Sequence, residues 1–264
     1  MAVSPSALGP MHFLPRPLGG EGRGEGVDKR HALAGQAPSP LPSPASGRGR
    51  DRQGVTAAPP RWLAIATTPL PPRGGGAGGE GALPAQERTQ ARQQIRAALI
   101  AELAQEIGCA PQALQISHER GQPPRLRQHG RALPIQLSIS HAPGLSLAAW
   151  CRAGSVGVDV QAVPRDATAA ELLRTAALFL EPKRLATLTS QAQNALFLEA
   201  FARHWARHEA ALKCAGQALV EYTPALAARL AGVRVTSLAL PAWAAADRVA
   251  ALAWRPASAA ITAP

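Results

Sequence analysis

An aspartate inside an apolar run is the residue whose position most needs a chemical explanation. In the segment 155–161, SVGVDVQ, valines alternate with Gly157, Asp159 and Gln161. Side chains alternate between the two faces of a strand, so this pattern predicts the three valines on one face and the other three residues on the opposite face. A carboxylate beside a core strand is costly unless it meets a counter-ion or a metal. The simpler alternative is an aspartate at a strand end that is solvated or caps a turn.

A glutamate and a lysine one helical turn apart are the candidate partners of this aspartate. The segment 192–215 predicts a long helix with a buried aromatic and aliphatic stripe, beside which Glu209 and Lys213 lie four residues apart. Such a pair can simply support the helix, by about 0.2–0.5 kcal/mol. The chemical alternative is that Glu209 joins Asp159 at a magnesium ion while Lys213 is held toward a phosphate, since Mg²⁺ often takes only one or two carboxylates plus phosphate oxygens.

A third cluster combines a hydroxyl with an imidazole at the end of a predicted strand. Ser140 and His141 stand in the segment 137–142, LSISHA, immediately before a Pro-Gly turn. Exposed backbone amides at such a junction can hold a phosphate. A nucleophilic Ser–His pair is the competing interpretation, but sequence neighbours seldom have triad geometry and the chain has no GxSxG elbow. We therefore exclude hydrolase chemistry.

Three arginines follow one stripe of a predicted helix. The segment Ala85–Ile107 lacks Gly and Pro, carries apolar residues at helical spacing, and is followed by Gly108. Arg88, Arg92 and Arg96 are four residues apart and therefore share one side of this helix. A solvated face and a phosphate-facing role both fit this stripe.

The elements that must position these residues alternate along the chain in an α+β order. A strand at 62–66 and the helix 85–107 come first, followed by strands at 136–140, 145–150 and 155–161. Helices are predicted at about 167–180, from 182 and at about 192–215, and strands near 233–240 and 249–254. This order predicts an α+β fold with two similar halves.

Composition bounds the folded part and its partners. Residues 1–60 are rich in Gly and Pro with a single aromatic, Phe13, so we predict that they are disordered and that one domain spans 61–264. Residues 61–264 hold 21 basic and 13 acidic residues, a net charge of +8 that suits anionic partners. The aromatic-interleaved or Lys-rich runs typical of nucleic-acid binding are missing, although the charge itself keeps that alternative open.

Cysteine number and hydropathy indicate the compartment. Cys109, Cys151 and Cys214 are odd in number and lack CxxC spacing, which favours reduced thiols and a cytoplasmic protein over a disulfide framework or a zinc site. No run approaches the roughly 20 apolar residues of a membrane span, and no signal peptide is apparent. We therefore expect no membrane association.

Read in chain order, four segments resemble the surfactin-type (Sfp-like) 4'-phosphopantetheinyl transferases. The resemblance covers roughly residues 61–256 and four motifs in the right order are far more specific than one. The motifs are RGQP at 120–123, SISHA at 138–142, VGVD at 156–159 and WARHEAALK at 205–213.

The resemblance implies a fold and an activity. The fold would be a pseudo-twofold pair of α/β subdomains, with halves at about 61–154 and 155–256 and coenzyme A between them. The activity would be that of a holo-[acyl-carrier-protein] synthase: transfer of the 4'-phosphopantetheine arm of coenzyme A to a serine of an acyl or peptidyl carrier protein, with Mg²⁺ as cofactor. A monomeric enzyme of fatty acid biosynthesis or secondary metabolism is expected.

The resemblance also implies residue roles. Asp159, Glu209 and Lys213 would form the catalytic group, with Asp159 and Glu209 as metal ligands and Glu209 helping to deprotonate the carrier serine. Gln161 stands where many bacterial members have a further acidic metal ligand. Contacts to coenzyme A would come from these eight residues: Ser140, His141, His208, Lys213, Arg120, Gln122, Arg88 and Arg92.

Three residues depart from the family pattern. Gln122 replaces a usual Lys or Arg, Gln161 supplies an uncharged oxygen, and His208 stands in the place of the lysine in a Lys-Glu-Ala sequence. An imidazole is only partly protonated near neutral pH, so His208 would be a conditional cation. These departures leave open a second interpretation, a catalytically weak or inactive relative that binds a carrier protein.

Overall fold

The computed structural model describes residues 59–67, 85–117 and 122–257. The chain divides into two units, Met1–Gly54 and Val55–Pro264, and every described residue belongs to the second. The predicted disorder of residues 1–60 therefore falls, apart from positions 59 and 60, outside the described residues. The predicted coenzyme A contact Arg120 lies outside them too.

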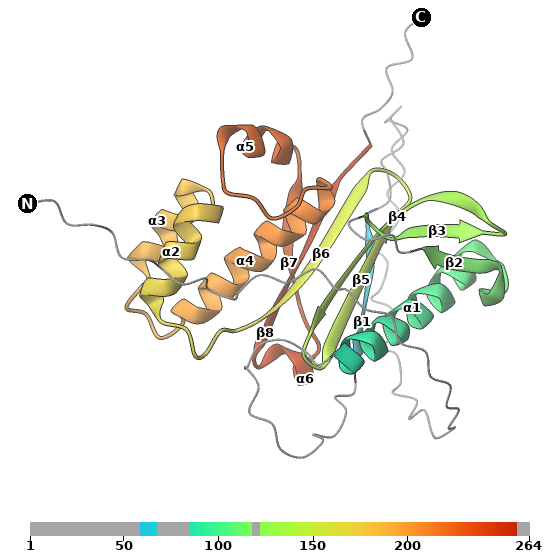
Figure 1. The fold of residues 1–264 in the computed structure, drawn as a ribbon, viewed down its shortest axis with the longest axis horizontal. Coiled ribbons are helices and arrows are strands. Elements are labelled where there is room, and N and C mark those ends of the chain that lie inside the picture. The colour runs from blue at the N-terminus through green and yellow to red at the C-terminus, as the bar shows by residue number, and fades with distance from the viewer. Residues whose placement is uncertain (1–58, 68–84, 118–121, 258–264) are drawn as a thin grey trace, which may run out of the picture. The chain divides into compact units, whose positions relative to one another are not determined.

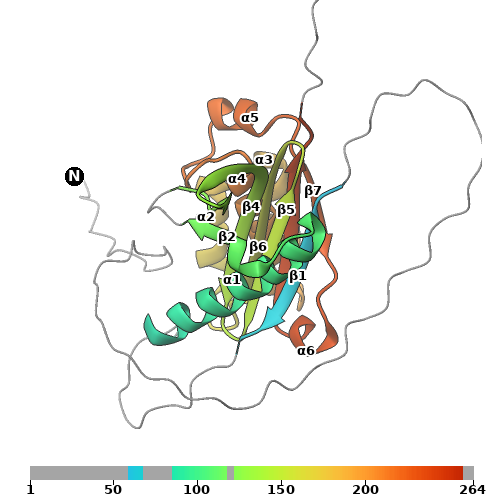
Figure 2. The ribbon, with the colours of Figure 1, turned by 90° about the vertical axis from the view of Figure 1, so that its right-hand side faces the viewer.

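A five-stranded antiparallel sheet forms the first half of the described chain. Its strands lie in the order β1-β5-β4-β3-β2. The long helix α1 packs against one face of this sheet through Ile95, Leu99 and Leu103, which are fully buried (Figures 1 and 2). The elements are β1 (Arg61–Ala66), α1 (Ala85–Ile107), a 3₁₀ turn (Pro111–Ala113), β2 (Leu114–Ser117), β3 (Arg125–Gln128), β4 (Arg131–Ala142) and β5 (Leu145–Cys151).

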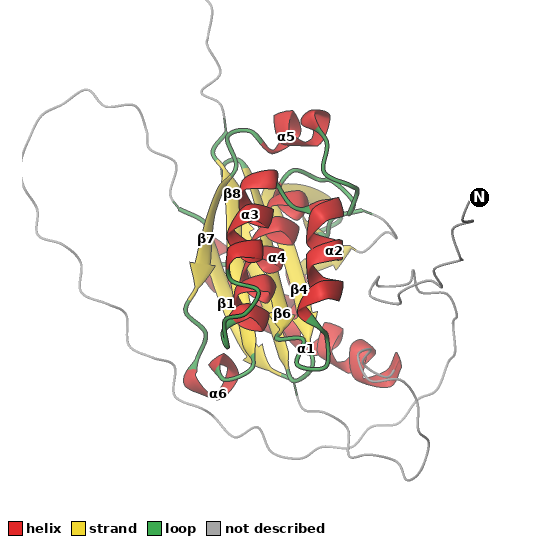
Figure 3. Ribbon diagram, turned by 90° about the vertical axis from the view of Figure 1, so that its left-hand side faces the viewer, coloured by secondary structure: helices red, strands yellow, loops and turns green. Residues whose placement is uncertain are grey.

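A three-stranded antiparallel sheet with several helices forms the second half. Its strand order is β6-β8-β7, helix α4 covers its outer face, and α2 and α3 pack on α4 (Figure 3). The elements are β6 (Ser155–Ala162), α2 (Ala169–Phe179), α3 (Pro182–Ser190), α4 (Phe197–Cys214), α5 (Pro224–Leu230), β7 (Arg234–Leu238), α6 (Ala242–Ala245) and β8 (Arg248–Arg255).

The two sheets share one apolar core. Leu145 and Leu147 of β5 pack with Val156, Val158 and Val160 of β6, so the valine face predicted from alternation points into this core. The layers therefore run α1, five-stranded sheet, three-stranded sheet, α4, and then α2 with α3 (Figure 1). The α+β class predicted from the sequence is confirmed.

Helix α4 and strand β6 approach each other unusually closely at Gly157. A Cβ atom at this position would lie 2.1 Å from the carbonyl oxygen of Ala210 and 2.5 Å from the backbone nitrogen of Cys214. Only glycine permits this backbone approach. Gly157 therefore sets the spacing between the strand that carries Asp159 and the helix that carries Glu209.

Several elements differ from the sequence prediction. The short strands β2 and β3 and the helices α5 and α6 were not predicted, and β4 begins at Arg131, before the predicted start at 136. Pro134 lies inside β4, where the pairing with β3 shifts register between Arg125 and Arg127; an irregularity of this kind is where a strand tolerates proline. Helix α4 begins at Phe197, because turns and a bend occupy residues 191–196.

Within the described residues, no helix is both long and apolar enough to cross a membrane.

Candidate functional site

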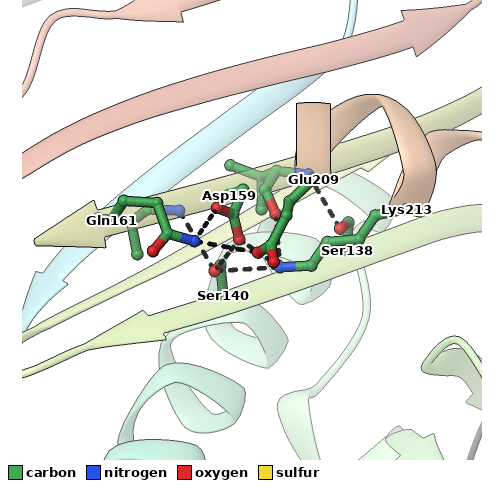
Figure 4. A network of polar contacts seen from close by, with 8 residues as sticks. Ser138, Ser140, Asp159, Gln161, Glu209 and Lys213 are labelled. Carbon is green, nitrogen blue, oxygen red and sulfur yellow. Dashed lines mark hydrogen bonds and ion pairs between the residues drawn. The ribbon is translucent and has the colours of Figure 1, made fainter. Parts of the chain in front are cut away.

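Asp159 of β6 is held by donors from three different elements. Its side chain is only 2% exposed. Ser140 of β4 donates to Oδ1 at 2.8 Å, Lys213 of α4 donates to the same oxygen at 2.6 Å, and the amide of Gln161 donates to Oδ2 at 2.7 Å (Figure 4). A buried carboxylate with three donors is not a solvated strand-end residue, so the simpler alternative for Asp159 is wrong.

Glu209 reaches the same network from α4. The Nε2 atom of Gln161 lies 3.0 Å from Glu209 Oε2 and 2.7 Å from Asp159 Oδ2, so one amide nitrogen contacts both carboxylates (Figure 4). The Nζ atom of Lys213 contacts Ser140 at 3.1 Å and the carbonyl oxygen of Val158 at 3.3 Å in addition to Asp159. The two carboxylates converge as predicted, and Lys213 is directed into the network instead of only supporting the helix.

The buried charges shift the pKa values of this network. Burial, and then the charge of Asp159, raises the pKa of Glu209 to about 8. Burial alone would lower the pKa of Lys213, but the charges of Asp159 and Glu209 outweigh it and raise that pKa. One ammonium group therefore faces two carboxyl groups, and a further cation between them would favour the ionised form of Glu209.

This shift predicts how stability depends on pH. Since the pKa of Glu209 is raised from 4.5 to about 8 on folding, the folded protein binds this proton more tightly than the unfolded chain does. Its contribution to the free energy of unfolding is complete below 4.5 and is lost as the pH rises toward about 8. Urea denaturation in metal-free buffer between about pH 5 and pH 9 should show this fall in the wild type and a flatter profile in Glu209→Gln. Parallel profiles in the two proteins would contradict the assignment.

Two serines of β4 join the halves at this point. Ser138 and Ser140 alternate on β4 and share the face toward β6, where their hydroxyl oxygens accept from the backbone N–H groups of Val158 at 3.0 Å and Val160 at 3.3 Å. Ser140 thus contacts backbone, Asp159 and Lys213 together. The predicted site residue Ser140 belongs to the network, and Ser138 is a neighbour whose role the sequence interpretation missed.

His141 lies among several cations beside the network. Its Nδ1 is 2.8 Å from the hydroxyl of Ser146. Burial lowers its pKa to about 4, with further lowering from the charges of Arg92, Lys213 and Arg96. Burial, then the charges of Arg96 and Arg88, lowers the pKa of Arg92. The arginine stripe of α1 is therefore close enough to act on His141, which favours the phosphate-facing interpretation and adds Arg96 to it.

Two other predicted coenzyme A contacts lie apart from the network. His208 is 5% exposed, its Nε2 has no hydrogen-bond partner, and burial followed by the charge of Arg184 lowers its pKa to about 4. It therefore faces α3 and is neutral around pH 7. Gln122 is exposed, just before β3.

A family model described as ACPS, the 4'-phosphopantetheinyl transferase superfamily, matches residues 155–246. This segment is therefore similar to the 4'-phosphopantetheinyl transferase superfamily. A search of curated proteins found no match to the chain. The matched segment contains Asp159, Gln161, Glu209 and Lys213, whereas Ser140 and His141 precede it.

The donor set of the matched segment fits a hard divalent cation. Among the described residues, no group of three or more His, Cys, Asp or Glu side chains is arranged to hold a metal. The carboxyl groups of Asp159 and Glu209 instead lie on either side of the Gln161 amide. If this amide rotates by 180°, its oxygen takes the place of its nitrogen and becomes a third possible metal ligand. Oxygen donors with few protein ligands suit Mg²⁺, which completes its shell with water and phosphate.

Proposed function

We propose that this protein transfers the 4'-phosphopantetheine arm of coenzyme A to a serine of an acyl or peptidyl carrier protein in a magnesium-dependent reaction. The observation that carries the proposal is the convergence of Asp159 and Glu209 on one amide inside a segment similar to the phosphopantetheinyl transferase superfamily. The two carboxylates come from β6 and α4, whose close approach requires the absence of a side chain at Gly157. The arrangement joins a candidate metal site to a partly buried lysine and a nearby row of arginines.

The residues of this chain would act mainly by positioning and charge. Lys213, with Arg92 and Arg96 near it, would bind phosphate oxygens, since phosphoryl transfer depends on orientation and neutralisation of charge. A bound Mg²⁺ would neutralise charge on the pyrophosphate. Glu209, as carboxylate, would take the proton of the carrier serine, directly or through a water, while the serine oxygen bonds to phosphorus and the phosphoanhydride bond breaks to release adenosine 3',5'-bisphosphate.

A mass-shift assay tests the proposal directly. Several apo carrier proteins, acyl and peptidyl, are incubated with the full-length protein, coenzyme A and Mg²⁺ and then weighed by intact-protein mass spectrometry. We expect one added phosphopantetheine group on at least one carrier, and none when EDTA replaces Mg²⁺ or when the acceptor serine is alanine. Unmodified carriers throughout the panel would contradict the proposal.

A weak or inactive carrier-binding relative is the second candidate function. The specific observation in its favour is His208, which is buried and neutral where the family resemblance expects a lysine. Gln161 also supplies no charge at a site where the resemblance expects an acid. Carrier binding measured by calorimetry without any mass shift would support this alternative.

Other parts of the proposal follow from the same resemblance. The halves 61–154 and 155–256 would be the two subdomains, related by a pseudo-twofold axis, and would act within one monomer. We expect a cytoplasmic enzyme whose carriers serve fatty acid biosynthesis or secondary metabolism, with no nucleic-acid or membrane partner. Sedimentation of the purified protein tests the monomer.

A further inference from the structure

A polar cavity lies on the side of α4 that points away from Glu209. It has a volume of about 370 Å³ and is bounded by the turn between α3 and α4, the first half of α4 and strand β7. Successive residues of a helix are about 100° apart, so His204 and Arg207 point well away from Glu209. Its charged and titratable lining residues are Glu199, Arg203, His204 and Arg207.

The wall of this cavity is predominantly basic. Arg203, His204 and Arg207 line it, against one carboxylate, Glu199, which is already paired with Arg203. Arg207 is held in place, because its Nη2 donates to the carbonyl oxygen of Val235 at 3.1 Å. The cavity thus presents an oriented guanidinium group with no acidic partner of its own among the described residues.

Unpartnered nitrogen atoms occur on this wall, at His204, and on the neighbouring residues of α3 and α4. Six buried side-chain polar atoms of the described residues lack a hydrogen-bond partner, and three of them are His204 Nδ1, His208 Nε2 and Arg184 Nη1. His208 is 5% exposed. Leaving a buried polar group unpaired is unfavourable, and a guanidinium nitrogen can only donate. The guanidinium nitrogen of Arg184 therefore requires an acceptor that the protein does not provide, and an imidazole nitrogen can donate to the same acceptor when it carries the proton.

Arg184 of α3 lies close enough to the cavity wall for its charge to act on His204. Burial, and then the charge of Arg184, lowers the pKa of His204. Arg184 has only a distant carboxylate, Glu181, at 3.7 Å, and its side chain is 28% exposed. A metal cation is disfavoured among these guanidinium groups, whereas an anion would be stabilised.

We propose that the cavity between the α3–α4 turn, α4 and β7 binds a phosphate-type oxyanion. Arg207 and His204 would donate from the cavity wall, and Arg184 would add charge and a free N–H from α3. A tetrahedral oxyanion offers acceptor oxygens in several directions and so matches donors that come from two helices. The oxyanion is either free inorganic phosphate or a phosphate group of a larger molecule such as coenzyme A. This site does not depend on the proposed transferase activity.

Titration of the full-length protein with inorganic phosphate tests the site. Binding is followed by calorimetry and by the imidazole ¹⁵N resonances of His204. We expect His204 to shift on titration and phosphate to bind at least about tenfold more weakly to Arg184→Gln and Arg207→Gln, as loss of a charged hydrogen bond implies. Arg174→Gln, an exposed arginine on α2, is the matched control and should bind as the wild type does.

Each outcome decides for or against the site. Shifts of His204 with coenzyme A but not with inorganic phosphate would support the site and identify a larger phosphate compound as its source. Unshifted His204 with both probes would overturn the proposal, as would equal phosphate affinity in the control and the two variants. Circular dichroism identifies an unfolded variant, and His204→Asn then provides the replacement, with the same weakening expected.

Discussion

Replacing Glu209 by glutamine should reduce phosphopantetheinyl transfer by about 10²–10³-fold without unfolding the protein. The substitution keeps the size of the side chain and its contact with the Gln161 amide, but removes a negative charge and the proposed base. Because burial raises the pKa of Glu209 to about 8, the side chain is largely protonated near pH 7 without metal, and the neutral amide that replaces it should preserve the fold. The rate of transfer to a responsive carrier at saturating coenzyme A and Mg²⁺ is the measurement.

The control for this prediction is Glu102→Gln, which removes an exposed carboxylate from α1 and should leave the rate unchanged. Melting temperatures of the three proteins separate loss of chemistry from loss of fold. Transfer by Glu209→Gln at the wild-type rate would remove Glu209 from the mechanism. The proposal for the carboxylate pair would then fail even if the wild type is a transferase.

Replacing Gly157 by alanine should damage both stability and activity. The new methyl group would meet the backbone of α4 at Ala210 and Cys214, and backbone cannot rotate away as a side chain can. Overpacking of this kind typically costs about 1–3 kcal/mol. The strand and the helix must separate, so the Gln161 amide can no longer contact both Asp159 and Glu209. We expect a lower urea midpoint and transfer reduced by about tenfold or more, since misplacement by about 1 Å can cost up to 10²-fold.

Val156→Ala is the matched control for the glycine substitution. Val156 lies on the opposite face of β6, in the core between the sheets, so its truncation should cost about 2 kcal/mol without moving α4. At a temperature where both variants remain folded, Val156→Ala should retain transfer and Gly157→Ala should not. Equal activity in both would mean that the spacing of helix and strand is not critical.

The sequence predicted the elements whose pattern is internal to one segment. The helix at 85–107 and the strands around Ser140, Leu147 and Asp159 follow from periodicity, turn residues and alternation, and the structure confirms them. Strands β2 and β3 have four residues each with few apolar side chains, so their pairing depends on neighbours that no local pattern reveals. The convergence of Asp159 with Glu209 was predicted because each needed a partner, not because local sequence located either one.

His208 illustrates why the position of a residue in a motif does not determine the direction of its side chain. It is next to Glu209 in the sequence, and the family resemblance therefore placed it among phosphate contacts. A helix turns by about 100° per residue, however, and the His208 ring lies 6.3 Å from the ring of Trp205, where the charge of Arg184 of α3 acts on it. The sequence assigned no role to Arg184, because its proximity to α4 arises only when α3 packs there. Sequence alone could propose the residue type but not the side of the helix.

A fragment of this protein that starts at residue 155 would lack the hydroxyl groups of Ser138 and Ser140. These hydroxyl oxygens accept hydrogen bonds from backbone N–H groups of Val158 and Val160 in β6. The superfamily match begins at this strand. In a fragment that starts at residue 155, β6 would therefore be an edge strand with unpaired N–H groups, and such edges promote self-association. The fragment would also leave Asp159 without the hydroxyl that binds it. We expect the matched segment alone to aggregate, because its stability depends on the preceding sheet.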